Sequence, residues 1–209
     1  MSGTDITNVH RMSVPVINYA GGMARWEPGA AQRLQQAALG LFASRGFDQS
    51  TAADIAEAAG LTERTFFRYF GDKREVLFYG QSDFVRLFLD GMAAAPADAT
   101  PMGLVAAAIA GAATSFPDER RPFSRMRQEV IDSNAALQER ERHKLAGLAV
   151  TIASELRERG ITEPAATLAA ESGATVFGIA FAQWIREGER RSLASIAAHT
   201  LTELHALHG

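Results

Sequence analysis

Two short helical segments, 51–59 and 62–70, separated by Gly60, constrain this chain more than any other feature of its 209 residues. Thr51 with Asp54 three positions later is typical of a capping box at a helix N-terminus. Gly60 suits the left-handed conformation that ends a helix. Two capped helices this short, joined by so tight a turn, predict a helix-turn-helix, the motif that places its second helix in the major groove of DNA.

The second segment has a clear inner and outer face. Thr62 is a favourable N-cap. Phe66 and Phe70 are four residues apart, so they share a face and are expected to pack inward. The other side chains from Thr62 to Tyr69 are expected to lie on the flanks and on the exposed face of this helix. Because a major groove accepts one helix and shows a distinct pattern for each base pair, that exposed face is the candidate DNA-reading surface.

The rest of the chain keeps the helical period, and no stretch alternates as a half-buried strand would. A first helix is expected over 28–45, with Gly46 as its C-terminal stop. Asp72 and Glu75 form a second capping-box pattern, which predicts a long fourth helix continuing through Phe88. The fold class is therefore all-α, with about nine helices. The later helices are expected at 102–115, 118–133, 135–159, 163–186 and 192–207.

Charge and composition limit the function. The chain has 21 Lys and Arg against 24 Asp and Glu, a formal net charge of −3, which excludes a protein that coats nucleic acid through a global positive field. Residues 24–79 are neutral, so DNA binding would depend on a local cluster of positive charge. The absence of cysteine excludes thiolate zinc sites and fits a reducing cytosol. No apolar run approaches the length of a membrane span and no secretory signal is evident, so a cytoplasmic protein without membrane contact is expected.

The sequence gives no sign of an enzyme. It has no glycine-rich phosphate loop, nucleophile elbow or zinc-protease motif. His205 and His208 lie three residues apart, but no third metal ligand accompanies them. We therefore expect no catalytic residues, no metal and no cofactor.

The segment from Gly46-Phe47 through 51–70 to Lys73 resembles the TetR family of one-component transcriptional regulators. Helix lengths, turn glycine, aromatic pair and following lysine all agree, and the resemblance covers about 33–77. The remainder matches only in being helical and of suitable length.

The resemblance implies a division of the chain into functional parts. A helix-turn-helix DNA-binding domain would occupy 28–74, and a helical ligand-binding and dimerisation domain 75–209. Residues 1–27, which lack any sustained period, are expected to form a disordered tail.

The resemblance also implies roles for individual residues. Arg64 stands where the family often has a small residue, and it could read guanine with a bidentate pair. Lys73, Arg68 and Tyr69 are expected to position phosphates. Phe67 departs from the family pattern, in which tyrosine usually donates its hydroxyl to a phosphate. The complete predicted DNA-binding set is Thr51, Thr62, Glu63, Arg64, Thr65, Phe67, Arg68, Tyr69 and Lys73.

Simpler interpretations of these residues stay open. Arg68 could be a solvated charge on a helix surface. Lys73 could pair with Asp72 or Glu75. Glu63 could act only by favouring the helix N-terminus electrostatically.

In the larger domain the resemblance implies a ligand cavity and a dimer seam. The predicted apolar pocket residues are Phe84, Phe88, Met102, Phe123, Met126, Phe177 and Phe181, which could instead be plain core. The predicted dimer residues lie on a helix over 164–186 that is rich in small side chains and on the segment 192–207: Ala170, Gly173, Ala174, Phe177, Phe181, Trp184, Leu201 and Leu204. The 164–186 helix could instead be the central buried helix of a monomeric core. The arginines at positions 120, 121, 125 and 127 fit an anionic ligand or a solvated helix face.

The function expected from this resemblance is a sequence-specific DNA-binding transcriptional repressor that acts as a homodimer on a near-palindromic operator. A small apolar ligand would favour a conformation in which the fourth helix swings the DNA-binding units out of register. The alternative is a helical small-molecule-binding or scaffolding protein that has lost DNA binding, which the missing tyrosine hydroxyl at Phe67 supports and Arg64, Arg68 and Lys73 oppose.

Overall fold

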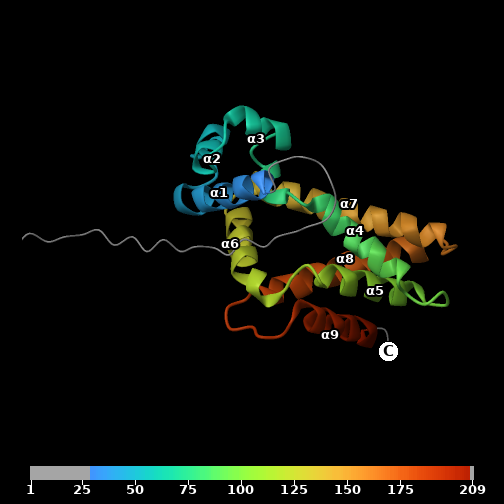
Figure 1. Cartoon of the computed structure of the whole chain (residues 1–209). Coiled ribbons are helices and arrows are strands. Elements are labelled where there is room, and N and C mark those ends of the chain that lie inside the picture. Colours follow the sequence, from blue (N-terminus) through green and yellow to red (C-terminus); the bar gives the residue numbers. More distant parts are fainter. Residues whose placement is uncertain (1–28, 208–209) are drawn as a thin grey trace, which may run out of the picture.

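The computed structural model describes residues 29–207, and this part of the chain contains helices and no strands, which confirms the all-α prediction (Figure 1). The predicted tail, 1–27, lies outside the described residues. The α-helices are α1 (Ala30–Arg45), α2 (Ala52–Ala58), α3 (Glu63–Tyr69), α4 (Gln81–Ala93), α5 (Pro101–Ala113), α6 (Arg121–Asp132), α7 (Ala135–Glu158), α8 (Ala165–Trp184) and α9 (Leu193–Ala206), and two 3-10 helices are η1 (Glu75–Phe78) and η2 (Asp118–Arg120).

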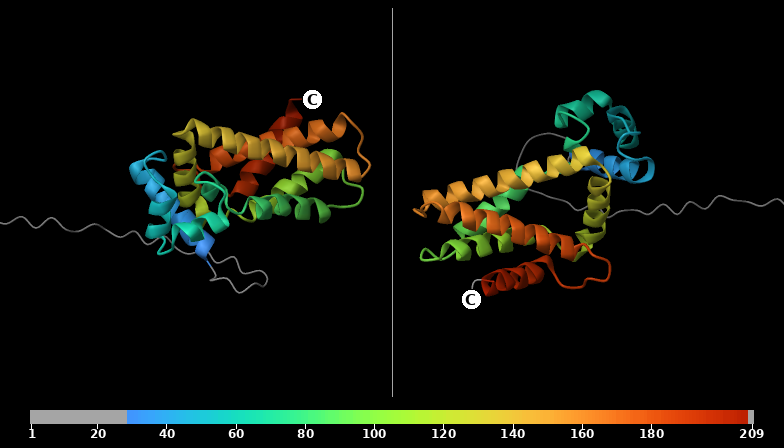
Figure 2. Two further views of the ribbon diagram at one scale, coloured as in Figure 1. Left: turned by 90° about the horizontal axis from the view of Figure 1, so that it is seen from above. Right: turned by 180° about the vertical axis from the view of Figure 1, so that it is seen from behind.

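The helices pack around two separate hydrophobic cores. The first lies inside the unit of α1, α2, α3 and η1, and the second lies among α4, α5, α7, α8 and α9. Figures 1 and 2 show the α1–α3 unit at one end of an elongated bundle, with α6 standing across that end between the unit and the α8–α9 side.

The first core does not stop at the predicted domain boundary after residue 74. Val76, Leu77 and Phe78 of η1 belong to it, and so do Val130 and Ile131 of α6 and Leu137 of α7. The α1–α3 unit is therefore packed onto the α6–α7 corner through shared apolar side chains.

The predicted fourth helix is wrong in its first part. Asp72 does accept hydrogen bonds from the backbone N–H groups of Arg74 and Glu75, but Glu75 turns towards α7 instead of completing a capping box. The segment forms the 3-10 helix η1, and Gly80, with φ of 85°, separates it from α4. A tertiary ion pair has overridden the local capping pattern.

Helices α4 and α5 cross at glycines. A Cβ atom on Gly91 would lie 2.4 Å from the Ala107 carbonyl oxygen, and one on Gly111 would lie 2.6 Å from the Leu87 carbonyl oxygen. The two backbones touch at this crossing, so no larger side chain fits there without displacing a helix.

Helix α8 corrects the expectation that no apolar run approaches the length of a membrane span. It has 20 residues and a mean hydropathy of 1.3, so by length and composition it is the one described helix that could cross a membrane. Its inner side, which includes Ala170, Val176 and Trp184, lies in the second hydrophobic core. The core helix of a globular bundle has the same composition.

Candidate nucleic-acid interface

Helices α2 and α3 are built by the predicted local interactions. The Thr51 hydroxyl accepts from the Asp54 N–H at 3.1 Å, and the Asp54 carboxylate accepts from the Thr51 N–H at 2.8 Å, which confirms the capping box. The Thr51 hydroxyl also donates to the Asp54 carboxylate at 2.7 Å, and this bond, together with the one from the Thr51 N–H, lowers the pKa of the Asp54 carboxyl. At the start of α3, the Thr62 hydroxyl accepts from the Thr65 N–H at 3.2 Å.

The inner side of α3 is fixed by its two phenylalanines. Phe66 is fully buried and Phe70 nearly so, with ring centroids 5.3 Å apart. Gly60 in the turn has a φ of 68°, a conformation that glycine adopts without steric cost. The turn therefore sets the direction of α3, and the phenylalanines set its rotation about its own axis.

The outer face of α3 carries two arginines around a phenylalanine. Arg64, Phe67 and Arg68 are exposed, and Phe67 keeps 53% of its surface. The Phe67 ring contacts Phe66 edge-on at 5.4 Å, and the Arg68 guanidinium lies 5.2 Å from the Tyr69 ring centroid. Thr62 and Glu63 are also exposed, while Thr65 and Tyr69 are half-buried. Eight of the nine predicted DNA-binding residues thus lie on α3 or at the N-caps of α2 and α3.

Lys73, the ninth, makes a contact that the sequence does not reveal. Its ammonium donates to the Phe47 carbonyl at 2.7 Å and lies 4.1 Å from the Phe47 ring centroid. The anticipated pairing with Asp72 or Glu75 does not occur, because Asp72 pairs with Arg74 and Glu75 pairs with cations of α7. An ammonium has three donors, so the bond to Phe47 leaves two for a phosphate.

The predicted pocket residues separate into two groups. Phe84, Phe88, Phe177 and Phe181 join Phe116 and Trp184 in one aromatic cluster of α4, the α5–α6 connection and α8, with neighbouring ring centroids 4.9–6.1 Å apart. Met102 packs against the same core. Phe123 instead packs against the core of the DNA-binding unit, and Met126 is 36% exposed. Most of these rings meet edge-on or tilted, whereas Phe177 and Phe181 are stacked.

Five of the eight predicted dimer residues lie inside the protomer. Ala170, Gly173, Phe177, Trp184 and Leu201 are buried, and a Cβ on Gly173 would lie 2.4 Å from Cγ1 of Val105. Ala174, Phe181 and Leu204 are partly exposed. The small residues of α8 serve close packing on α5. The outward side of α8 carries Leu168, Glu171, Thr175, Ile179 and Ala182.

Two arginines of the α6 run bind backbone carbonyls of the protein itself. Arg125 donates to the carbonyl of Ile185, the C-cap of α8, and to that of Arg186. Arg121 donates to the Glu189 and Arg191 carbonyls in the connection between α8 and α9. Arg125 therefore satisfies carbonyls at the end of α8, and Arg121 fixes the connection that follows it.

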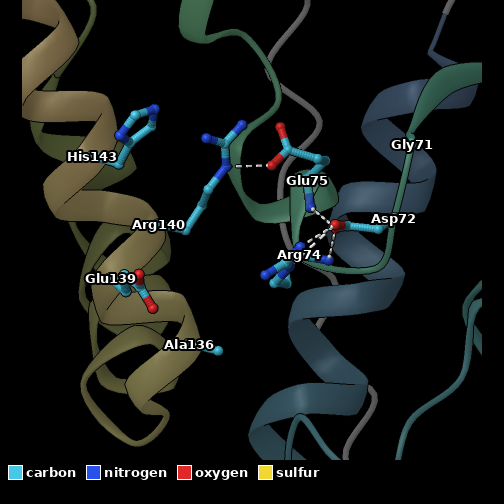
Figure 3. Close-up of a pocket in the computed structure, with 8 residues that line it drawn as sticks. All are labelled: Gly71, Asp72, Arg74, Glu75, Ala136, Glu139, Arg140 and His143. Carbon is cyan, nitrogen blue, oxygen red and sulfur yellow. Dashed lines mark hydrogen bonds and ion pairs between the residues drawn. The ribbon is translucent and has the colours of Figure 1, made fainter.

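A polar crevice of about 580 Å³ separates the turn after α3 from α7 (Figure 3). The Glu75 carboxylate reaches across it to Arg140, with Oε1 2.5 Å from Nε. The sequence pattern gave no hint of this crevice, because the spacing of charges on α7 does not identify the acid they pair with. Its lining residues are Gly71, Asp72, Arg74, Glu75, Ala136, Glu139, Arg140 and His143.

Among residues 29–207, no three His, Asp or Glu side chains gather as a metal site would require. His205 is exposed near the end of α9, and His208 lies outside this range. The described histidines therefore offer no ligand set from which metal chemistry could be derived.

Comparison with known proteins identifies the segment that contains this interface. Residues 34–79 match the family profile described as bacterial regulatory proteins, tetR family. The HTH-type transcriptional regulator TcmR of Streptomyces glaucescens is 35% identical over 90 residues. That match covers 39% of this chain and 40% of TcmR, so it spans well under half the length of the relative.

Solved structures share the whole architecture at low identity. The fatty acid degradation regulator FadR from Bacillus halodurans has a TM-score of 0.56 at 19% identity, covering 83% of this chain and 96% of that one. FadR from Bacillus subtilis in complex with stearoyl-CoA has a TM-score of 0.56 at 18% identity, with the same coverage. At these identities the likeness is one of fold.

Proposed function

The chain belongs to the TetR family of bacterial regulatory proteins, and on that premise we propose that it is a homodimeric, sequence-specific DNA-binding repressor whose operator affinity is lowered by a small apolar ligand. The observation that carries the proposal is the outer face of α3. Arg64 and Arg68 stand exposed on either side of Phe67, on a helix whose direction and rotation are fixed from within. Such a helix can enter a major groove without rearrangement.

Because the chain has a net charge of −3, attraction to DNA would depend on a local cluster of positive charge. Arg64 and Arg68, with Lys73 at the turn behind α3, supply positive charge on this face. Arg64 near the start of α3 is the proposed base-reading residue, and Arg68, Tyr69 and Lys73 the proposed phosphate-positioning residues.

The test is a fluorescence-anisotropy titration of the purified chain against a duplex that it selects from a random double-stranded library. We expect binding that resists scrambled competitor DNA and weakens as salt rises. Arg64→Ala is expected to lower affinity for the selected duplex roughly tenfold or more, because a bidentate arginine–guanine pair contributes about 1–3 kcal/mol of discrimination.

The matched control is Arg86→Ala. Arg86 is exposed on α4, away from α3, and forms only a long 3.9 Å ion pair with Asp90. Equal effects of the two substitutions would remove Arg64 from the base-reading role. Selection of no preferred duplex would favour the alternative function, a helical small-molecule-binding protein that no longer reads DNA.

The proposed ligand is apolar because the aromatic cluster is the largest gathering of aromatic side chains in the described bundle. Since the rings of that cluster pack against one another here, ligand entry would have to part α4 from α8. B. subtilis FadR, a protein of the same fold, is known with stearoyl-CoA bound. An acyl-CoA series is therefore the first ligand panel, measured as release of the selected duplex.

The proposed dimer uses the outward side of α8. Leu168 is 63% exposed and Ile179 52%, and Thr175 and Ala182 lie along the same side. Exposed apolar side chains beside small ones suit a close helix–helix contact between two protomers. A regulator that acts on chromosomal DNA in this way would work in the cytoplasm.

A further inference from the structure

Three cations from α6 and α7 surround the 3-10 helix η1, which connects α3 to α4. Glu75 accepts from Arg140 at 2.5 Å (Figure 3). Glu75 also pairs with Lys144 at 3.3 Å. Arg127 donates to the Leu77 carbonyl at 2.9 Å. We call Arg127, Arg140 and Lys144 the cation clasp.

The clasp also holds the aromatic side chain of η1. Phe78 has the Arg127 guanidinium 5.1 Å and the Lys144 ammonium 5.5 Å from its ring centroid. Arg127 is itself fixed by an ion pair with Glu141 at 3.0 Å. The three cations are only 15–31% exposed, so water screens these interactions less than it screens a surface pair.

The attachment of η1 to α4 is weaker. The chain leaves η1 through Tyr79, which is 46% exposed, and Gly80, which has a positive φ. Beyond this break, the buried residues of α4, Phe88 and Met92, belong to the second core. The DNA-binding unit thus shares a core and three cations with the α6–α7 corner, but only a glycine hinge with α4.

Helix α6 connects the clasp to the region of the proposed ligand. Near its N-terminal end, Arg125 binds the carbonyl at the C-cap of α8, and Arg121 binds carbonyls of the α8–α9 connection. The Arg121 guanidinium also lies 5.2 Å from the Trp184 ring centroid in the aromatic cluster. One turn before the C-terminal residues of α6 enter the first core, Arg127 holds Leu77. Helix α6 therefore links η1 to the C-terminal end of α8.

We propose that the cation clasp positions the helix-turn-helix for operator binding by fixing η1 on the α6–α7 corner. This rests on the proposed function, because it assigns the residues that set the separation of the two recognition helices in the dimer. The clasp residues lie outside α3 and act through η1, so they are positioning residues.

The test compares Arg140→Gln/Lys144→Gln with wild type on the selected duplex and on the same duplex lengthened by roughly two base pairs between its half-sites, about a fifth of a helical turn. Wild type is expected to prefer the native spacing. The double variant is expected to lose about tenfold of that preference, a typical coupling between sites, while its affinity for a single half-site stays unchanged. A defect that merely weakened folding would lower both affinities together.

Control variants separate positioning from charge. Arg140→Lys keeps a cation beside Glu75 and is expected to restore most of the spacing preference. Arg142→Gln removes an exposed charge from the same helix and is expected to have no effect. Lys144→Gln alone provides a milder change if the double variant does not fold. The proposal would be overturned by a folded variant that lacks the Lys144 cation, alone or together with the Arg140 cation, and still keeps the full spacing preference.

Hydrogen exchange tests the clasp without DNA. Amides of residues 51–70 are expected to exchange faster in the double variant, while those of α4 keep their wild-type rates. If wild type selects no duplex, the proposed function fails, and this measurement alone decides the clasp. Unchanged exchange over 51–70 would overturn it.

Discussion

Phe67 is the residue that most distinguishes this recognition helix. Its ring is 53% exposed between Arg64 and Arg68 and is steadied edge-on by Phe66. A phenylalanine side chain has no hydrogen-bond donor for a base in the major groove, but its ring can contact the 5-methyl group of thymine. We expect Phe67 to read thymine where the family's tyrosine would bind a phosphate.

Replacing thymines of the selected duplex by uracil, one at a time, tests this role because uracil lacks only the methyl group. At one position per half-site, wild type is expected to lose about threefold to tenfold in affinity, and Phe67→Ala is expected to lose nothing further. Anisotropy titrations of both proteins on both duplexes give the coupling directly. Additive losses at every thymine would show that Phe67 contacts none of them.

At the same scale, the sequence predicted what short-range chemistry decides. The caps at Thr51 and Thr62 and the inward faces of Phe66 and Phe70 depend on spacings of three and four residues, and the structure has them all. The sequence did not predict the hydrogen bond from Lys73 to the Phe47 carbonyl. The partner lies 26 positions away, and a backbone carbonyl carries no sequence signal.

Among the elements, the crossing of α4 and α5 gives a direct test of packing. Gly91→Ala would place a Cβ 2.4 Å from the Ala107 carbonyl oxygen. We expect this substitution to lower the free energy of unfolding by about 1–3 kcal/mol. Gly147→Ala on α7 is the matched control, because its Cβ meets nothing within 4 Å and alanine favours the helix by roughly 0.5–1 kcal/mol. Chemical denaturation should move the two midpoints in opposite directions, and equal shifts would contradict the close crossing.

The pairing of η1 with α7 predicts a pH dependence. The hydrogen bond from Arg140, together with the nearby Lys144 charge, holds the pKa of the Glu75 carboxyl below its ordinary value despite partial burial. A depressed carboxyl pKa stabilises the fold above the ordinary value of about 4.3, and this stabilisation is lost as pH falls through the lowered pKa. The thermal stabilities of wild type and Glu75→Gln should therefore differ most near neutrality and converge as pH falls below about 4.3 and through the lowered pKa. A difference that stays constant as pH falls below about 4.3 would contradict the assignment.

The break before α4 shows why element boundaries were harder to predict than residue faces. Asp72 and Glu75 have capping-box spacing, and Val76, Leu77 and Phe88 fit a continuous helical stripe. The deciding interactions come from Arg127, Arg140 and Lys144, which are fifty or more positions away from their partners in the sequence. Local periodicity carries no information about such partners.

For the whole molecule, the proposed dimer seam is inferred from the apolar side chains that one protomer leaves uncovered. Small residues on α8 were expected to mark the seam, but the same composition serves packing within the protomer, as Gly173 against Val105 shows. Sequence composition cannot separate the two uses. The exposed positions can, and they place Leu168 and Ile179 at the proposed seam.

Ile179→Glu is expected to convert the dimer to a monomer, because it would bring two carboxylates together where two apolar side chains meet. Analytical ultracentrifugation measures the state directly, with Ile179→Leu as a control that keeps the apolar surface. Each protomer carries one α3. The monomer should therefore bind a single half-site with wild-type affinity, but it should lose the additional affinity that a dimer gains from the second half-site. An Ile179→Glu variant that sediments as a dimer would place the seam on another face. A monomer that binds the full duplex as tightly as wild type would show that operator recognition does not require the pair.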